Sequence, residues 1–246
     1  MDETPKIPTT PKGSGTLSAR VGTHQYFAGE HLDAAKFMAD SCQRREQQCE
    51  QDGRTGIDLE ARSYALAAIV ESAAFIEAVV NELWHDADKY GANMSSPYLE
   101  GLDQHSVNLL RELGTKSRVE RSLTVLEKYD LTLLCAGKNP IDKGRNPGQD
   151  VKALIKARNA LVHFKPELHW EDDVHALEQQ IKPRVPINPL MKGAGPWFPH
   201  HLLCSGVAHW AWEQSVELVE EWRQSLGLVR DYKTRGPTYW ITSDDG

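Results

Sequence analysis

The segment from Asp58 to about Tyr90 repeats its apolar residues at helical spacing, and it constrains the fold more than any other part of the chain. At about 100° per residue these side chains form one wide face. The face consists of Ile69, Phe75, Ile76, Val79, Val80 and Leu83. Asp58 can cap the helix, and Glu60 lies in its first turn, where an acidic side chain is favoured. A long helix that other helices can cover is therefore predicted.

Helical patterns also occur in five other segments. They span about 29–51, a short stretch at 105–113, 117–134, 150–164 and 200–226. Ser117 and Glu120 have the spacing of a capping box at the start of the third of these. Alternation typical of a strand occurs only in a brief run near 239–242. The predicted fold class is all-α, a bundle of about five main helices.

The domain organisation follows from shifts in composition. Residues 1–22 are rich in Pro, Thr, Ser, Gly and Lys and lack apolar periodicity, which predicts a disordered N-terminal tail. One helical domain is expected over 23–230, followed by a C-terminal tail over 231–246. Within the domain, residues 166–199 contain six prolines. So long an insertion is typical of functional or mobile segments.

Composition limits the class of protein. A chain of 246 residues with 40% hydrophobic content suits one globular domain, and its net charge of -7 argues against a generally basic nucleic-acid binder. The four cysteines form no C-x-x-C pair, as is usual for a reduced protein inside the cell. The N-terminus lacks the apolar core of a secretion signal, and the apolar run 65–80 is interrupted by Glu71, Ser72 and Glu77. A cytoplasmic protein with no membrane partner is predicted.

Arg158 stands out in the helix predicted over 150–164. It falls near the middle of an apolar stripe formed by Leu154, Ile155, Leu161 and Val162. A guanidinium there is costly unless it meets a carboxylate or a phosphate. Asn159 and His163 are four residues apart and share a second face. Pro166 favours a helix end near His163, so Arg158, Asn159 and His163 are expected to converge at one helix end.

These three residue types suit RNA cleavage. A neutral imidazole, here His163, can take a proton from a ribose 2′-hydroxyl. Arg158 can hold the phosphate in a bidentate fork and stabilise the charge that develops on it. Asn159 can orient the imidazole or the substrate. This chemistry requires no metal and no cofactor.

Local charge supports an anionic ligand at this helix. Between Lys138 and Lys165 there are seven basic side chains and two acidic ones, a local excess of five positive charges in an acidic chain. The side chains expected to bind RNA are Arg145, Lys152, Lys156 and Lys165. Phosphates would be attracted to this region.

A structural role for the same residues is the main alternative. Arg158 can pair with Glu71 or Glu77, which lie on the remaining stripe of the helix over 58–90. His163 can simply favour the negative end of its helix dipole. The chain would then be a non-catalytic helical module that binds a nucleotide or a partner protein.

The segment 151–164, VKALIKARNALVHF, resembles the third major helix of HEPN domains, whose signature is R-x4-6-H. The segment 69–83 is also similar to an early helix of several bacterial HEPN-like proteins. The resemblance implies a metal-independent endoribonuclease with Arg158, Asn159 and His163 as its catalytic residues, and Glu77 and Glu71 can support the arginine. It also implies a homodimer, a role as a toxin or in phage defence, and a possible inhibitory partner protein. The N-terminal extension and the Pro-rich insertion depart from a minimal HEPN domain.

Two other groups of residues were weighed for function. His200, His201, Cys204 and His209 lie close in sequence, but no second ligand pair with zinc-finger spacing accompanies them. Ordinary helix residues and no metal site are therefore expected there. Trp197, Trp210, Trp212 and Trp222 are expected in the core or in a dimer interface rather than as base-stacking groups.

Overall fold

A computed structural model describes residues 20–23, 25–90, 96–117, 122–166, 174–192, 195–232 and 240–243. The chain divides into two compact units. One spans 26–235 and is helical, and the other combines 1–25 with 236–246.

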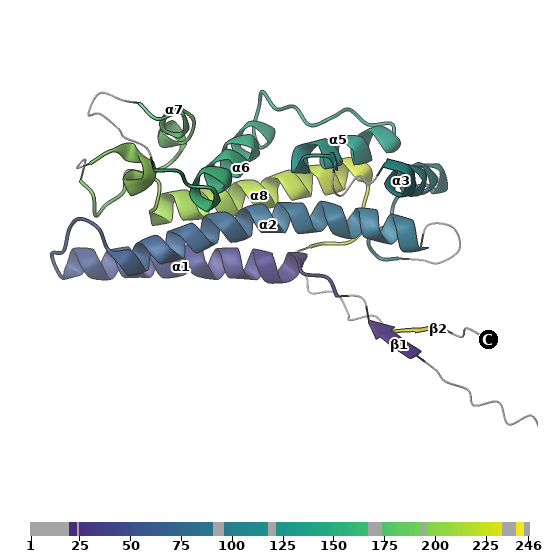
Figure 1. The fold of residues 1–246 in the computed structure, drawn as a ribbon, viewed down its shortest axis with the longest axis horizontal. Coiled ribbons are helices and arrows are strands. Elements are labelled where there is room, and N and C mark those ends of the chain that lie inside the picture. Colours follow the sequence, from purple (N-terminus) through teal and green to yellow (C-terminus); the bar gives the residue numbers. More distant parts are fainter. Residues whose placement is uncertain are drawn as a thin grey trace, which may run out of the picture. The chain divides into compact units, whose positions relative to one another are not determined.

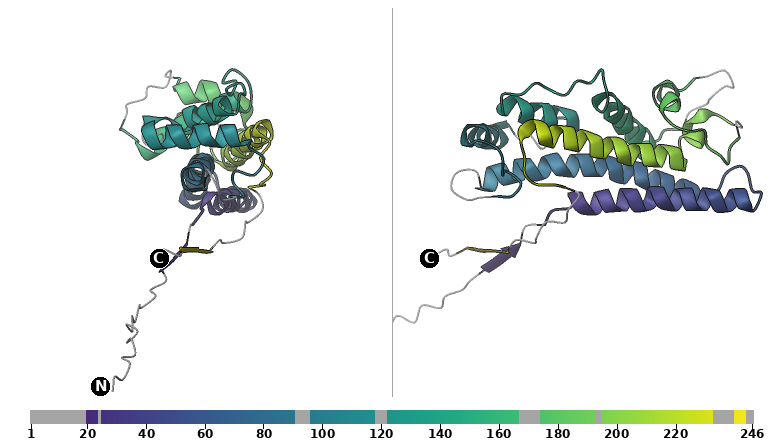
Figure 2. Two further views of the ribbon diagram at one scale, coloured as in Figure 1. Left: turned by 90° about the vertical axis from the view of Figure 1, so that its right-hand side faces the viewer. Right: turned by 180° about the vertical axis from the view of Figure 1, so that it is seen from behind.

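The helical unit is built around two long helices and a third that packs against both. α1 (Ala28–Gln51) lies along α2 (Leu59–Tyr90), and α8 (Ser205–Leu226) contacts both of them. On the other side of α2 and α8 from α1 lie α3 (Gln104–Ser117), α5 (Val125–Cys135) and α6 (Gly148–Val162) (Figure 1). The short α7 (Ala176–Ile181) packs beside α6, and Figure 2 shows the layers from two further directions. The predicted all-α class is confirmed.

α2 is the central helix because it is covered from several sides. Small residues such as Ala61, Ala65 and Ala68 are buried along its first half, and larger ones such as Phe75 and Ile76 follow. By length and composition alone α2 could cross a membrane, but half of its most apolar window is buried inside the protein. That burial is what a bundle's central helix requires.

Two aromatic side chains of the core, Tyr129 and Trp222, have hydrogen-bond partners for their polar atoms. The Tyr129 hydroxyl donates to the carbonyl oxygen of Ile76 at 2.8 Å, and Trp222 Nε1 donates to Thr132 Oγ1 at 2.7 Å. The Tyr129 and Trp222 rings meet edge to face, with centroids 4.8 Å apart. Trp210 and Trp222 are buried, as the sequence predicted, and Trp197 and Trp212 are partly buried against the core.

The predicted helix start at Ser117 is wrong, and Glu120, its expected partner in a capping box, lies outside the described residues. Ser117 is the last residue of α3, and residues 118–121 lie outside the described part of the chain. The capping box belongs to Thr124, which precedes α5: its backbone N–H and its hydroxyl both donate to the Glu127 carboxylate at 2.7 Å. The apolar run that a helix needs follows Thr124 directly, since Leu126 and Tyr129 are buried.

Two other predicted helix starts are also shifted. α6 begins at Gly148, so Asp150 lies inside its first turn and is buried rather than capping it. α8 begins at Ser205 rather than near His200, after a π-type turn over Trp197–His201 that contains the non-helical Phe198. The backbone N–H of Ser205 donates to Glu46 of α1 at 2.9 Å, which gives α8 an acidic group at its N-terminus.

The other unit contains a two-stranded antiparallel ladder of β1 (Arg20–Thr23) and β2 (Trp240–Ser243). Its register places Arg20 opposite Ser243 and Thr23 opposite Trp240. Residues 20–22 of the expected N-terminal tail are therefore in a strand, while residues 1–19 lie outside the described part. The brief alternating run predicted near 239–242 coincides with β2.

The described parts of the Pro-rich insertion over 166–199 include short helical elements. α7 is followed by a 3-10 turn over Lys182–Arg184, and Leu177 and Ile181 are buried against the core. Arg184 Nε lies 2.6 Å from Oδ1 of the buried Asp150, which ties the insertion to the first turn of α6. Residues 167–173 and 193–194 lie outside the description.

Candidate active site at the end of helix α6

Arg158 extends from α6 toward the middle of α2. Its Nη2 lies 3.3 Å from Glu77 Oε2, and the two side chains are 24% and 42% exposed. The predicted pairing with Glu77 is therefore present, but the pair lies at the edge of the core. Water and ligands can reach both partners, which distinguishes this contact from a buried ion pair.

The position of Arg158 on α6 explains this partial exposure. The buried face of α6 is formed by Val151, Ala153, Leu154 and Ala157. Val162, expected to share the buried stripe with Arg158, is exposed. The buried face of α6 is therefore centred on the side of Ala153 and Ala157, and Arg158 lies at the border of that face.

Glu71 has a different partner. Its Oε2 lies 2.6 Å from His31 Nδ1 on α1. Residues 71 and 77 are six apart, which places them about 120° apart around α2. Glu77 therefore faces α6 while Glu71 faces α1, and the expected support of Arg158 by Glu71 is not found.

Asn159 and His163 are both exposed to solvent. His163 is the C-cap of α6, and its backbone N–H donates to the carbonyl oxygen of Asn159 at 2.9 Å. An exposed imidazole at a helix end can meet a substrate directly. The insertion that follows the motif leaves this side chain open in the described structure.

Arg158 and His163 do not point the same way. Stepping at about 100° per residue places them about 140° apart around α6. Arg158 contacts Glu77 of α2, whereas His163 lies on the solvent side. The two residues share one helix end, as predicted, but a single subunit does not direct both side chains at one point.

Lys152 and Lys156 share the face of Asn159 and His163. By the same stepping all four lie within about 60° of one another on α6, and all four are exposed. Lys156 Nζ donates to Gln180 Oε1 of α7 at 3.2 Å. Lys165, just beyond the helix, is also exposed. The lysines predicted to bind RNA thus flank the exposed histidine.

Arg145 lies elsewhere and has carboxylate partners. Its Nη2 is 2.6 Å from Glu221 Oε1 of α8, and its Nε is 3.9 Å from Asp142 Oδ2. These contacts fasten the loop between α5 and α6 to α8. Arg145 is thus placed against α8, whereas Lys152 and Lys156 lie on the exposed face of α6, and binding of RNA by Arg145 stays a prediction.

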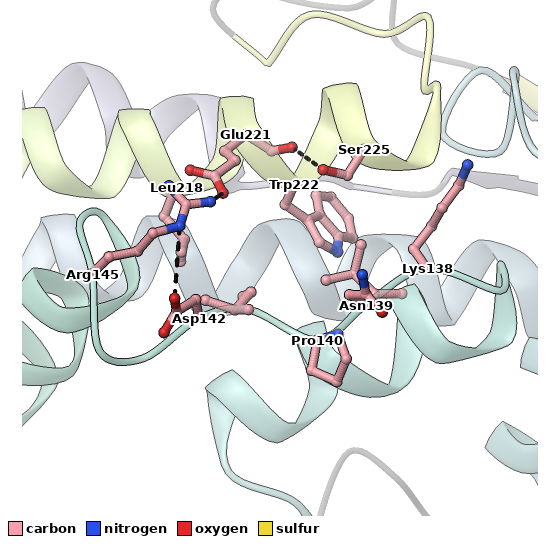
Figure 3. A pocket seen from close by; sticks show the side chains of 11 residues that line it. Lys138, Asn139, Pro140, Asp142, Arg145, Leu218, Glu221, Trp222 and Ser225 are labelled. Carbon is pink, nitrogen blue, oxygen red and sulfur yellow. Dashed lines mark hydrogen bonds and ion pairs between the residues drawn. The ribbon is translucent and has the colours of Figure 1, made fainter.

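The same loop and α8 enclose a pocket of about 400 Å³ (Figure 3). Arg145 lies at one end with Asp142 and Glu221, Lys138 lies at the other, and Trp222 lies between them. The remaining lining residues are Leu133, Asn139, Pro140, Ile141, Leu218 and Ser225. No residue of the Arg158, Asn159 and His163 group lines this pocket.

Phe164 was not singled out by the sequence, although it directly follows His163. Its ring is 52% exposed, and its centroid lies 6.3 Å from that of Phe198. Phe198 is buried and stacks on His175, with centroids 4.3 Å apart and planes inclined by 11°. The only available signal in the sequence was an aromatic residue adjacent to the motif histidine.

The residues that suggested a zinc site have other partners. His200 Nδ1 lies 2.9 Å from Arg62 Nη1, and burial together with Arg62 lowers the pKa of His200. His209 Nε2 lies 3.0 Å from Asp40 Oδ1, and burial raises the pKa of the Cys204 thiol to about 12. Within the described ranges no three His, Cys, Asp or Glu side chains form a metal-binding group.

A buried acidic group at the far end of α2 was also missed. Glu82 Oε1 accepts hydrogen bonds from the backbone N–H groups of Phe27 and Ala28, each at 2.8 Å. Burial raises the pKa of the Glu82 carboxyl to about 7. One turn later, Asp86 accepts a hydrogen bond from the Tyr26 hydroxyl at 2.8 Å. These contacts bind the segment before α1 to α2, which is a structural role.

Comparison of the chain with protein-family models, with curated proteins and with solved structures finds no match.

Proposed function

We propose that the protein is a HEPN-like, metal-independent endoribonuclease whose active site lies at the end of α6. The observation that carries this proposal is the exposed His163 at the C-cap of α6, with Arg158 a little more than one turn earlier in a partly exposed ion pair. An accessible imidazole and an accessible guanidinium are the two groups that cleavage through the ribose 2′-hydroxyl needs.

In the proposed reaction His163 acts as the general base. It removes the proton of the 2′-hydroxyl, the 2′-oxygen attacks the adjacent phosphorus, and the bond to the 5′-oxygen of the next nucleotide breaks. The leaving 5′-oxygen takes a proton from water, so the products are a 2′,3′-cyclic phosphate and a 5′-hydroxyl. Arg158 stabilises the negative charge that develops on the phosphate, and Asn159 positions His163 or the substrate.

Arg158 must exchange Glu77 for the phosphate during this reaction. An ion pair between partly exposed side chains is worth about 1 kcal/mol or less, because water screens both charges. A phosphate that accepts two guanidinium N–H groups can compete with such a contact. Before RNA binds, Glu77 keeps the guanidinium in position.

Lys152 and Lys156 would guide the RNA strand toward the motif. They share the exposed face of Asn159 and His163, and successive positions four residues apart rise by about 6 Å along the helix. Their charges favour contact with successive phosphates, and Lys165 extends the basic surface past the helix end.

A homodimer could bring an arginine and a histidine to the same phosphate, although Arg158 and His163 of one subunit point in different directions. Because these side chains leave α6 about 140° apart, one phosphate can meet an arginine and a histidine more readily where two copies of α6 face each other. The HEPN resemblance implies the same assembly. A cytoplasmic toxin or phage-defence effector, held inactive by an inhibitory partner protein, is the cellular role that this activity would suit.

The test is cleavage of single-stranded RNA in the presence of EDTA. Wild type should release fragments with cyclic-phosphate ends, and Arg158→Ala or His163→Ala should lower the rate by a hundredfold or more. The matched control is His105→Ala, which removes an exposed histidine on a different helix, α3, and should keep the wild-type rate. Equal rates in all four proteins, or no cleavage at high protein concentration, would overturn the proposal.

A non-catalytic module that binds a nucleotide or a partner protein is the second candidate. The Arg158 to Glu77 contact favours it, since that contact already gives the arginine a carboxylate partner. Under this alternative, nucleotides raise the melting temperature of the protein without any RNA turnover.

A further inference from the structure

We propose that Phe164 stacks an unpaired nucleobase of the RNA that His163 cleaves, so that the substrate is single-stranded at the cleavage site. The inference rests on the proposed ribonuclease function and adds a base-binding position to it. Phe164 is adjacent to the proposed general base, and half of its ring surface is open to solvent.

The ring of Phe164 is supported from the protein side. Phe198, 3% exposed, lies 6.3 Å away between centroids, and the two planes are inclined by 31°. His175 stacks on Phe198 in turn. Phe198 and His175 belong to the turn before α8 and to the start of α7, so the Pro-rich insertion supplies this support. An aromatic ring backed in this way loses little freedom when a ligand stacks on it.

The neighbours of Phe164 match the parts of one nucleotide. His163 precedes it and can act on a ribose hydroxyl, and the exposed Lys165 follows it and can contact a phosphate. Because the three exposed residues are consecutive in sequence, an aromatic ring at this position suits a base attached to that sugar and phosphate. A base inside a duplex has both faces covered by its neighbours, so only an unpaired base offers a free face.

A second copy of the protein is the competing occupant of this apolar ring. The charges around it favour RNA, because the exposed Lys165 and Lys156 attract phosphate. The experiment below distinguishes the two occupants by measuring self-association together with RNA affinity.

The test measures binding rather than cleavage. A fluorescent single-stranded oligonucleotide with 2′-deoxy sugars at every position cannot be cut through a 2′-oxygen, so affinity can be measured in the wild-type protein whether or not it is an enzyme. Phe164→Ala and Phe164→Leu should each weaken binding roughly tenfold, because neither keeps an aromatic face. Phe164→Trp should bind at least as tightly as wild type. Phe37→Ala, which removes an equally exposed ring from α1, should change nothing.

Three results would overturn the inference. The first is equal affinity of wild type and Phe164→Ala for the oligonucleotide. The second is equal affinity of wild type for the single strand and for the same sequence in a duplex. The third is a loss of self-association in Phe164→Ala with unchanged affinity for the oligonucleotide. Circular dichroism confirms that each variant is folded. If Phe164 controls binding of the single strand but ribose-containing RNA is never cleaved, the stacking site stands and the ribonuclease proposal fails.

Discussion

The guanidinium of Arg158 and the carboxylate of Glu77 lie 3.3 Å apart, and this contact joins the end of α6 to the middle of α2. Within the described ranges it is the only ion pair of Arg158, and both partners are accessible to water. The two residues are 81 positions apart in sequence, so the bundle itself sets the position of the arginine.

Glu77 should affect catalysis more than stability. Glu77→Ala removes the group that positions Arg158, so we expect the single-turnover rate of RNA cleavage to fall several-fold, while the free energy of unfolding changes by about 1 kcal/mol or less. Glu77→Gln keeps an acceptor oxygen and should retain most of the rate. Glu71→Ala, on the same helix but paired with His31, is the control. A stability loss well above that value without a change in rate would identify the pair as purely structural.

The lysines on the exposed face of α6 should govern RNA affinity. Replacing both Lys152 and Lys156 by Ala should weaken binding to an RNA oligonucleotide at least tenfold and make the affinity less dependent on salt, because fewer counterions are released. Arg145→Ala should leave both quantities unchanged, since Arg145 lies against Glu221 of α8 and not on the exposed face of α6 that carries the two lysines. Fluorescence anisotropy at several salt concentrations measures both. If Arg145→Ala weakened RNA binding as much as the double lysine variant does, Arg145 would belong to the RNA-binding surface.

The stability of the protein should depend on pH through Glu82. Its pKa is about 7 in the folded protein and near 4.5 when the chain is unfolded, so the folded state holds the proton more tightly. The stabilising effect of that proton is present below about pH 4.5 and is lost as the pH rises to about 7. The shift corresponds to about 3 kcal/mol.

Glu82→Gln cannot ionise and should remove this component. We expect a smaller difference in the free energy of unfolding between pH 5 and pH 8 than in wild type, measured by urea denaturation. The neighbours that act on Glu82 are the N–H groups of Phe27 and Ala28, the positive Arg230 and the negative Asp86. Glu100→Gln at an exposed position is the control. Parallel pH profiles for Glu82→Gln and wild type would contradict the assignment.

The ion pair of Asp150 and Arg184 should anchor the insertion. Arg184→Ala leaves the carboxylate of Asp150 buried without its cation, so we expect a loss of about 3 kcal/mol in the free energy of unfolding. The double variant Asp150→Asn with Arg184→Ala should recover part of that loss, because the unpaired charge is gone. If the single and the double variant unfold at the same denaturant concentration, the pair contributes little.

Periodicity predicted the long helices well because their pattern is repeated over many turns. The expected 29–51 and 58–90 differ from the observed α1 and α2 by one residue at the N-terminal end. Helix starts were less predictable where two candidates compete. Both Ser117 and Thr124 are followed three residues later by Glu, and α5 has its capping box at Thr124.

The partners of the site residues depend on how the helices pack against one another. The apolar periodicity of the sequence does not contain that information. The sequence allowed Glu71 or Glu77 as the partner of Arg158, and the choice depends on which side of α2 faces α6. Arg145 belonged to a basic stretch in the sequence, yet its main partner Glu221 is 76 positions away. The environment of Phe164 depends on Phe198, a residue of the Pro-rich insertion whose ring packs near it.

The ladder of β1 and β2 has a consequence for engineering the chain. Because the strands are antiparallel and Arg20 lies opposite Ser243, a two-residue turn inserted between those residues would convert the ladder into an ordinary hairpin. The chain could then be opened at an exposed turn such as that around Gly53. The result would be a circular permutant in which α2 comes first and α1 last, with the same helices packed around α2.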